Sequence, residues 1–117
     1  MGSILVVDDD SSILETVTAI LELEGYAVTT AADSVEALRV IEQRFPALVL
    51  LDMRMPALDG WGFVRELDRR EVRVPIVVMT AAQDARRWAV EIGAAGYLAK
   101  PFELPDLLVT VERLLTA

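Results

Sequence analysis

The sequence predicts a doubly wound α/β fold, in which helices alternate with the strands of a parallel sheet. Short apolar runs alternate with helical patterns from one end of the chain to the other, and we count five such units in 117 residues. Three of the runs have no polar alternation, which is typical of central parallel strands buried on both faces. The length suits one domain, residues 1–117, which would bury about two-thirds of its unfolded surface.

The first half of the chain holds two of these units. Residues 4–7 form the first predicted strand, and residues 12–15 have the capping-box spacing that begins a helix, which ends at Gly25. Residues 26–31 are rich in β-branched side chains and predict a less buried strand near a sheet edge. A second helix begins at 33–36 and stops before a Phe-Pro pair. The residues expected to face inward from these helices are Ile13, Val17, Ile20, Leu21, Leu23, Val35, Leu38, Val40 and Ile41.

The third strand is the most apolar one. Residues 49–51 are all aliphatic and are followed by an acidic residue, a turn at 57–60 and a third helix that ends in the charged run 68–71. Trp61 lies off the apolar stripe of this helix, so we expect it to be partly exposed. Residues 76–79 form the fourth predicted strand after a proline.

The last part of the chain completes the alternation. Asp84 is placed to cap a short fourth helix, in which Trp88 shares the apolar stripe and which Gly93 closes. Residues 96–99 predict the fifth strand, and residues 104–115 predict a final amphipathic helix with a proline tolerated in its first turn.

The composition excludes several kinds of chemistry. The chain has no cysteine and no histidine, so thiol catalysis, zinc-cysteine sites and histidine general-base chemistry are absent. The formal net charge of −8 repels nucleic acid phosphates and anionic membranes, so we expect no direct nucleic acid binding and no membrane contact. No apolar stretch approaches the ~20 residues of a membrane span, and we expect a cytoplasmic protein.

Polar residues follow four of the predicted strands. They are Asp8 and Asp9 after the first, Asp52 after the third, Thr80 after the fourth and Lys100 after the fifth. Because parallel strands place their carboxyl ends at one edge of the sheet, these residues are expected to converge on the crevice where open α/β sheets bind ligands.

This set of residues favours phosphoryl transfer. Clustered carboxylates repel one another and need a cation, and ligands that are all oxygen select a hard divalent ion, Mg²⁺ or Mn²⁺. A carboxylate beside such an ion can attack a phosphoryl group, while Lys100 and Thr80 supply a positive charge and a hydroxyl for the phosphoryl oxygens. Asp10 is expected instead to cap the following helix.

The same residues carry a resemblance that covers essentially the whole chain. The sequence resembles the receiver domain of two-component response regulators, and its layout is similar to the free-standing chemotaxis receiver. Each motif is weak alone, but five in this order at appropriate spacings are specific. The matching pieces are Val6-Val7-Asp8-Asp9, Asp52-Met53-Arg54-Met55-Pro56 with Asp59-Gly60, Thr80-Ala81, Gly96-Tyr97 and Lys100-Pro101-Phe102.

The resemblance implies a fold and a function. It implies a flavodoxin-like three-layer sandwich with five helices and the strand order 2-1-3-4-5. It also implies that Asp52 accepts a phosphoryl group from a histidine kinase, a phosphotransfer protein or a small donor such as acetyl phosphate. Phosphorylation would then change the surface formed by the fourth helix, fifth strand and fifth helix so that it binds a protein partner. That partner could be a second copy of the receiver, which would give a phosphorylation-dependent homodimer. The chain would catalyse its own phosphorylation and dephosphorylation without being a turnover enzyme.

The resemblance also assigns roles to the other residues of the site. Asp9, Asp52 and the backbone carbonyl of Arg54 would bind Mg²⁺, and Asp8 would act through a metal-bound water. Thr80 and Lys100 would hold phosphoryl oxygens. By the same resemblance, Tyr97 would be a switch aromatic coupled to Thr80, and the Lys100-Pro101 peptide would be cis. Arg54 and Ala82 stand at the positions that flank the attacking water in this family, and we expect slow self-dephosphorylation.

Three other readings remain open at this point. One is a small phosphatase of the haloacid-dehalogenase type with Asp8 as its nucleophile. The sequence has Ser12 where the phosphatase signature expects threonine, and it has no acidic pair late in the chain. This reading also leaves Asp52 without a role. Another is a receiver-like module that no longer accepts phosphate, against which the complete acidic set argues. The last is a receiver excised from a larger regulator, since the final helix leaves the chain either free-standing or a fragment.

Overall fold

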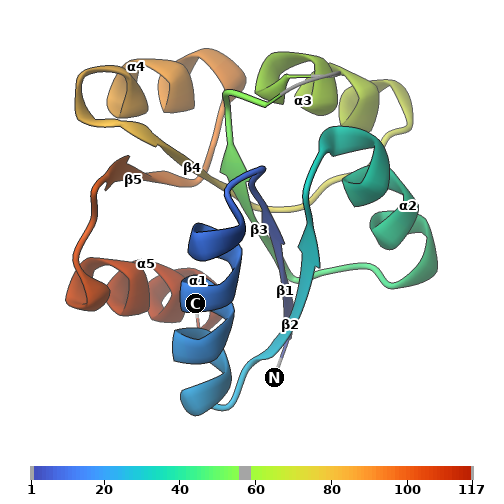
Figure 1. The fold of residues 1–117 in the computed structure, drawn as a ribbon. Coiled ribbons are helices and arrows are strands. Elements are labelled where there is room, and N and C mark those ends of the chain that lie inside the picture. Colours follow the sequence, from blue (N-terminus) through green and yellow to red (C-terminus); the bar gives the residue numbers. More distant parts are fainter. Residues whose placement is uncertain (1, 56–58, 117) are drawn as a thin grey trace.

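A five-stranded parallel sheet forms the centre of the molecule, with the strand order β2-β1-β3-β4-β5 (Figure 1). The computed structural model describes residues 2–55 and 59–116. The strands are β1 (Ser3–Val7), β2 (Ala27–Ala31), β3 (Leu48–Asp52), β4 (Ile76–Ala81) and β5 (Gly96–Lys100). Both the parallel sheet and the implied strand order are therefore confirmed, and the less buried 26–31 segment does lie at a sheet edge.

Helices cover both faces of this sheet. They are α1 (Ser11–Leu23), α2 (Ser34–Gln43), α3 (Gly60–Arg69), α4 (Ala82–Ile92) and α5 (Leu104–Thr116). Figure 1 shows α1 and α5 on one side of the sheet and α2, α3 and α4 on the other. This is the three-layer sandwich that was expected.

The central strands are apolar on both faces because each face has its own core. Leu5, Val49 and Val78 pack with residues of α2, α3 and α4. Ile4, Leu50 and Val77 point the opposite way and pack with residues of α1 and α5. Successive strand residues alternate between the two faces, so a strand that lies between two helical layers needs an uninterrupted apolar run.

Two of the predicted helix starts are wrong. α1 begins at Ser11 and not at the capping box of residues 12–15. The expected capping role of Asp10 is confirmed, because its Oδ1 accepts from the Ser12 N–H at 2.9 Å. α4 begins at Ala82, and no side chain of the described part of the chain caps it. Asp84 lies inside the first turn of α4, where it pairs with arginine side chains.

Two residues predicted to face inward are exposed. Leu23 is 87% exposed and Val35 is 50% exposed. Each stands two positions, or about 200° of helix rotation, from a buried residue, Leu21 and Ala37 respectively, so each points away from the sheet. Hydrophobicity alone does not distinguish these faces.

The expected end of α4 and the expected cis peptide bond are both present in the structure. Gly93 ends α4 with a left-handed backbone (φ 68°), and the Lys100-Pro101 peptide is cis. Half of the turn expected at 57–60, residues 57 and 58, lies outside the described residues, whereas Asp59 caps α3 by accepting from the N–H of Gly62 at 2.9 Å. No helix among residues 2–55 and 59–116 is long and apolar enough to cross a membrane.

Candidate phosphoryl-transfer site

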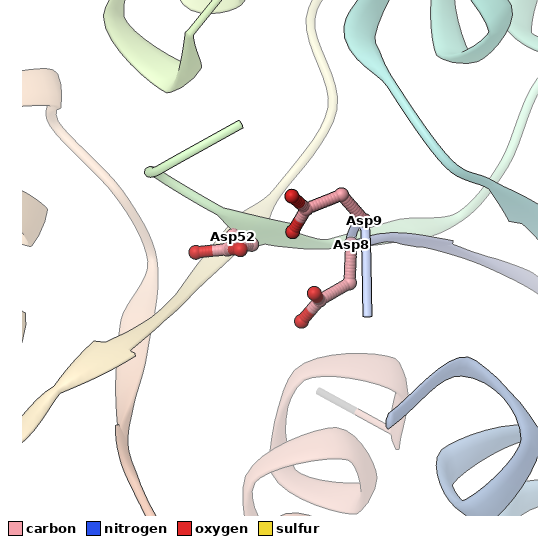
Figure 2. A group of neighbouring side chains, drawn as sticks. All are labelled: Asp8, Asp9 and Asp52. Carbon is pink, nitrogen blue, oxygen red and sulfur yellow. The ribbon is translucent and has the colours of Figure 1, made fainter. Parts of the chain in front are cut away.

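Three aspartates from two neighbouring strands meet at the carboxyl edge of the sheet (Figure 2). Asp8 and Asp9 directly follow β1, and Asp52 is the last residue of β3, which pairs with β1. One carboxylate oxygen from each of the three lies within 4.8 Å of the others. The parallel register therefore brings together residues that are more than 40 positions apart in the sequence.

Asp8 is the most deeply placed of the three. It is fully buried, its Oδ1 accepts from the Asp10 N–H at 2.9 Å, and its Oδ2 accepts from Lys100 Nζ at 2.7 Å. A carboxylate that is removed from water needs such partners, and the lysine at the end of β5 supplies the compensating charge. This ion pair holds Lys100 over the site.

Asp52 is buried with fewer compensating contacts. It is 6% exposed, its Oδ1 accepts from the Arg54 backbone N–H at 3.1 Å, and its Oδ2 lies 3.8 Å from Lys100 Nζ. Burial, together with the charges of Asp8 and Asp9, raises the pKa of the Asp52 carboxyl to about 6, against the lowering effect of the Arg54 N–H and Lys100. Asp52 is ionised at neutral pH, but its charge is poorly compensated.

Thr80 and Tyr97 lie on the two neighbouring strands. Thr80 is 2% exposed near the end of β4, where it pairs in register with Ala99 of β5. Tyr97 is 46% exposed and pairs with Val78, two positions nearer the start of the strand. The fold thus places Thr80 at the edge of the sheet that carries the aspartates and leaves Tyr97 on the outer surface of β5.

A second group of residues lies beside the aspartates, of which Arg54 was expected at the site and Trp88 was not. The side chains of Arg54, Trp61 and Trp88 border a cleft of about 420 Å³ that Asp9 also lines. Local sequence patterns could not show that the three residues lie together, because they come from the segment after β3, from α3 and from α4. The partly exposed position of Trp61 was the one available signal.

The donor set of the acidic group fits a hard cation. Three carboxylates face a single ammonium group, so the site as formed by these four side chains has a formal charge of −2 at neutral pH. All the side-chain donors of the cluster are oxygen atoms, which hard divalent ions prefer. The acidic pocket is therefore suited to a divalent cation.

Comparison with known proteins identifies the family. The model of the family described as the response regulator receiver domain matches residues 4–112. The chain belongs to this family. Among solved structures, the receiver domain of NtrX from Brucella abortus has a TM-score of 0.89 at 34% identity, covering 98% of this chain and 99% of that one. Vibrio cholerae chemotaxis protein CheY4 has a TM-score of 0.87 at 33% identity, covering 97% and 98%.

Curated relatives of the receiver domain are longer proteins. The probable transcriptional regulator ycf27 of Cyanophora paradoxa is 44% identical over 114 residues, which are 96% of this chain and 47% of that protein. Transcriptional regulatory protein PrrA of Mycobacterium tuberculosis is 42% identical over 114 residues, 96% of this chain and 49% of that protein. The chain thus spans about half the length of these two relatives.

Membership of the family gives the function class of the chain. It is a phospho-accepting receiver domain of two-component signalling, which implies a histidine kinase as its partner. The phosphatase reading is not favoured. It needs Asp8 as a nucleophile, but this receiver domain buries Asp8 completely and engages it with Lys100.

Proposed function

We propose that Asp52 is the residue of this receiver domain that accepts the phosphoryl group. One arrangement supports this assignment: Asp8, Asp9 and Asp52 place oxygens within 4.8 Å of one another, and Lys100 Nζ lies 3.8 Å from Asp52 Oδ2. Asp8 Oδ2 is already held by the shorter contact to Lys100, at 2.7 Å, whereas Asp52 Oδ2 lies 3.8 Å from the same ammonium group and is the less tightly engaged of the two.

The proposed step is a nucleophilic attack by a carboxylate oxygen of Asp52 on phosphorus. A new oxygen–phosphorus bond forms while the bond from phosphorus to the leaving group breaks. In a phosphohistidine the leaving group is the imidazole nitrogen, which keeps the electron pair and takes a proton from solvent. The pKa of about 6 leaves Asp52 ionised at neutral pH, and we propose that Lys100 and Thr80 hold phosphoryl oxygens during transfer.

We further propose that the acidic pocket holds Mg²⁺, or Mn²⁺ in its place. Asp9, Asp52 and the backbone carbonyl of Arg54 would be direct ligands, and Asp8 would act through a water. The bound ion would offset the repulsion between the attacking carboxylate and the phosphoryl oxygens. The mutual proximity of the three carboxylates and the net negative charge of the site support this choice.

The output of phosphorylation is proposed to be a change in protein binding. Tyr97, exposed on β5, would serve as the switch aromatic coupled to Thr80, and the surface formed by α4, β5 and α5 would bind the partner or a second receiver. A cavity of about 940 Å³ lies between these three elements and borders Tyr97, which supports a binding role for this face.

The boundaries and setting of the domain are also proposals. We propose a single receiver domain over residues 1–117 that works in the cytoplasm. The net charge of −8 supports the absence of direct contact with nucleic acid or anionic membranes. The names of the curated relatives concern longer proteins, so their role in transcriptional regulation is not assigned to the receiver itself.

Chemical trapping of the modified residue tests the assignment. The protein is incubated with Mg²⁺ and acetyl phosphate, the acyl phosphate is reduced with borohydride, and the modified aspartate is located by peptide mass. We expect the label on Asp52 and no label in Asp52→Ala. A label on Asp8 would refute the proposal and restore the phosphatase reading, and the absence of any label would refute phosphoryl acceptance from this donor.

A further inference from the structure

Arg54 contacts the acidic site with its backbone and helix α4 with its side chain. Its N–H donates to Asp52 Oδ1 at 3.1 Å. Its guanidinium carbon lies 5.1 Å from the ring centre of Trp88, and its Nη2 lies 3.7 Å from Asp84 Oδ2. Trp88 and Asp84 both belong to α4, so one residue joins the phosphoacceptor to this helix.

The hold of the Arg54 side chain on α4 is loose. The side chain is 71% exposed, and its ion pair with Asp84 is longer than a hydrogen bond. Arg87 makes the closer contact to the same carboxylate, at 2.7 Å, and its guanidinium carbon lies 6.0 Å from the same Trp88 ring. Asp84 therefore keeps a cationic partner if Arg54 moves away, so the loss of the Arg54 contact costs little free energy.

Phosphorylation would change the charge that Arg54 faces. A carboxylate that carries one negative charge would be replaced by an acyl phosphate that carries up to about two, with several strong acceptor oxygens. Lys100 pairs with Asp8 at 2.7 Å, so its single charge is shared between Asp8 and the phosphoryl oxygens and leaves room for a second cation. Arg54 borders the cleft that Asp9 lines, its backbone N–H donates to Asp52, and its side chain is 71% exposed, so we take its guanidinium as the second cation for the new charge.

We propose that Arg54 is a positioning residue that couples the charge at residue 52 to helix α4. In the unphosphorylated receiver its guanidinium rests on Trp88 and Asp84. When Asp52 carries a phosphoryl group, the guanidinium moves to the phosphoryl oxygens, and α4 loses one of its contacts with the segment after β3. This inference rests on the proposed role of Asp52 and adds to it the side chain that transmits the change.

The tryptophans of the chain provide the reporter for this movement. Trp61 of α3 packs edge-on against Trp88, with ring centres 4.7 Å apart, and its Nε1 donates to Glu91 of α4 at 3.1 Å. The chain has two tryptophans, and both are in this cluster. Removal of a cation from the face of Trp88 changes the environment of the indole, so tryptophan emission should respond when Arg54 leaves.

The experiment compares emission with phosphate occupancy in the full chain. Wild type, Arg54→Met and the control Arg87→Met are each treated with acetyl phosphate and Mg²⁺. Intact mass gives the phosphorylated fraction, and the change in tryptophan emission is expressed per bound phosphate. We expect a change in wild type, its retention in Arg87→Met, and its loss in Arg54→Met, whose starting emission should already resemble that of the phosphorylated wild type.

The possible outcomes separate this inference from the assignment of Asp52. If the wild type gains no phosphate, or gains it at another residue, the proposed function fails first. If the wild type is phosphorylated without a change in emission, or if Arg54→Met shows the same change as the wild type, the coupling role is refuted. Failure of Arg54→Met to accept any phosphate would also refute it, because the side chain would then act in transfer instead of in the response.

Discussion

Replacing Asp52 with asparagine should stabilise the metal-free protein at neutral pH. The wild-type carboxylate is 6% exposed and faces Asp8 and Asp9. Asparagine has nearly the same shape and keeps an oxygen that can accept the Arg54 N–H, but it carries no charge. Lys100 retains its 2.7 Å contact with Asp8. The substitution therefore removes the buried charge and leaves the surrounding contacts in place.

The size of the effect follows from the pKa of Asp52. Folding raises this pKa from 3.8 to about 6. Each pKa unit corresponds to about 1.4 kcal/mol, so the ionised form opposes folding by about 3 kcal/mol. Between these two pH values the native state binds more protons than the unfolded state. The free energy of unfolding of the wild type therefore falls as pH rises from about 4 to about 6. Asp52→Asn has no carboxyl group at this position, so its stability does not show this fall.

Urea unfolding at a series of pH values measures this difference. In the presence of a chelator, Asp52→Asn should exceed the wild type by about 3 kcal/mol at pH 7.5, and the gap should close near pH 4. Added Mg²⁺ should stabilise the wild type more than the variant, because the variant lacks one of the proposed ligands. Asp68→Asn, which alters an exposed carboxylate on α3, is the control and should change stability little at any pH.

Two results would refute this reasoning. If Asp52→Asn and the wild type were equally stable at pH 7.5 without metal, the carboxylate would not be as poorly compensated as its surroundings indicate. If the variant were more stable by the same amount at pH 4 and at pH 7.5, the gain would not come from the titration of Asp52.

Three further substitutions test contacts at the site and on helix α3. Lys100→Met leaves the fully buried Asp8 without its cation and should cost about 3 kcal/mol in urea unfolding. Gly60→Ala should cost about 2 kcal/mol in the same assay, because its Cβ would lie 2.8 Å from Met53 Cα. Glu66→Gln should reduce acid sensitivity: hydrogen bonds and ion pairs with two arginines lower the Glu66 pKa to about 2, so its stabilising effect is present above about pH 4.5 and is lost as pH falls toward 2.

Each of these predictions has an outcome that contradicts it. If the urea concentration at the unfolding midpoint were the same for Lys100→Met and the wild type, the buried Asp8 carboxylate would not depend on Lys100 for its compensation. A neutral Gly60→Ala would show that the backbone after β3 can move away from α3. For Glu66→Gln, acid unfolding that follows the wild-type curve between pH 4.5 and pH 2 would show that this exposed cluster does not affect stability.

The alternation of the sequence was enough to predict most of the fold. Uninterrupted apolar strands such as 49–51 and 76–79 require helices on both faces, and the structure has them. The start of α1 was predicted less well because Asp10 and the 12–15 capping box both offered a cap, and only the path of the chain after β1 selects between them. The same limit applies to Asp84, whose side chain is drawn to Arg54 and Arg87 instead of to the helix end.

For the site, the residue pattern alone predicts which polar residues stand at the strand ends. Parallel strands must bring these ends together, so the meeting of Asp8, Asp9 and Asp52 followed from the pattern. How their charges are balanced, and the turn of the Arg54 side chain toward Trp88 of α4, became visible only in the folded chain. Charge compensation and aromatic contacts depend on distances between elements that are remote in sequence, whereas burial patterns repeat locally along the chain.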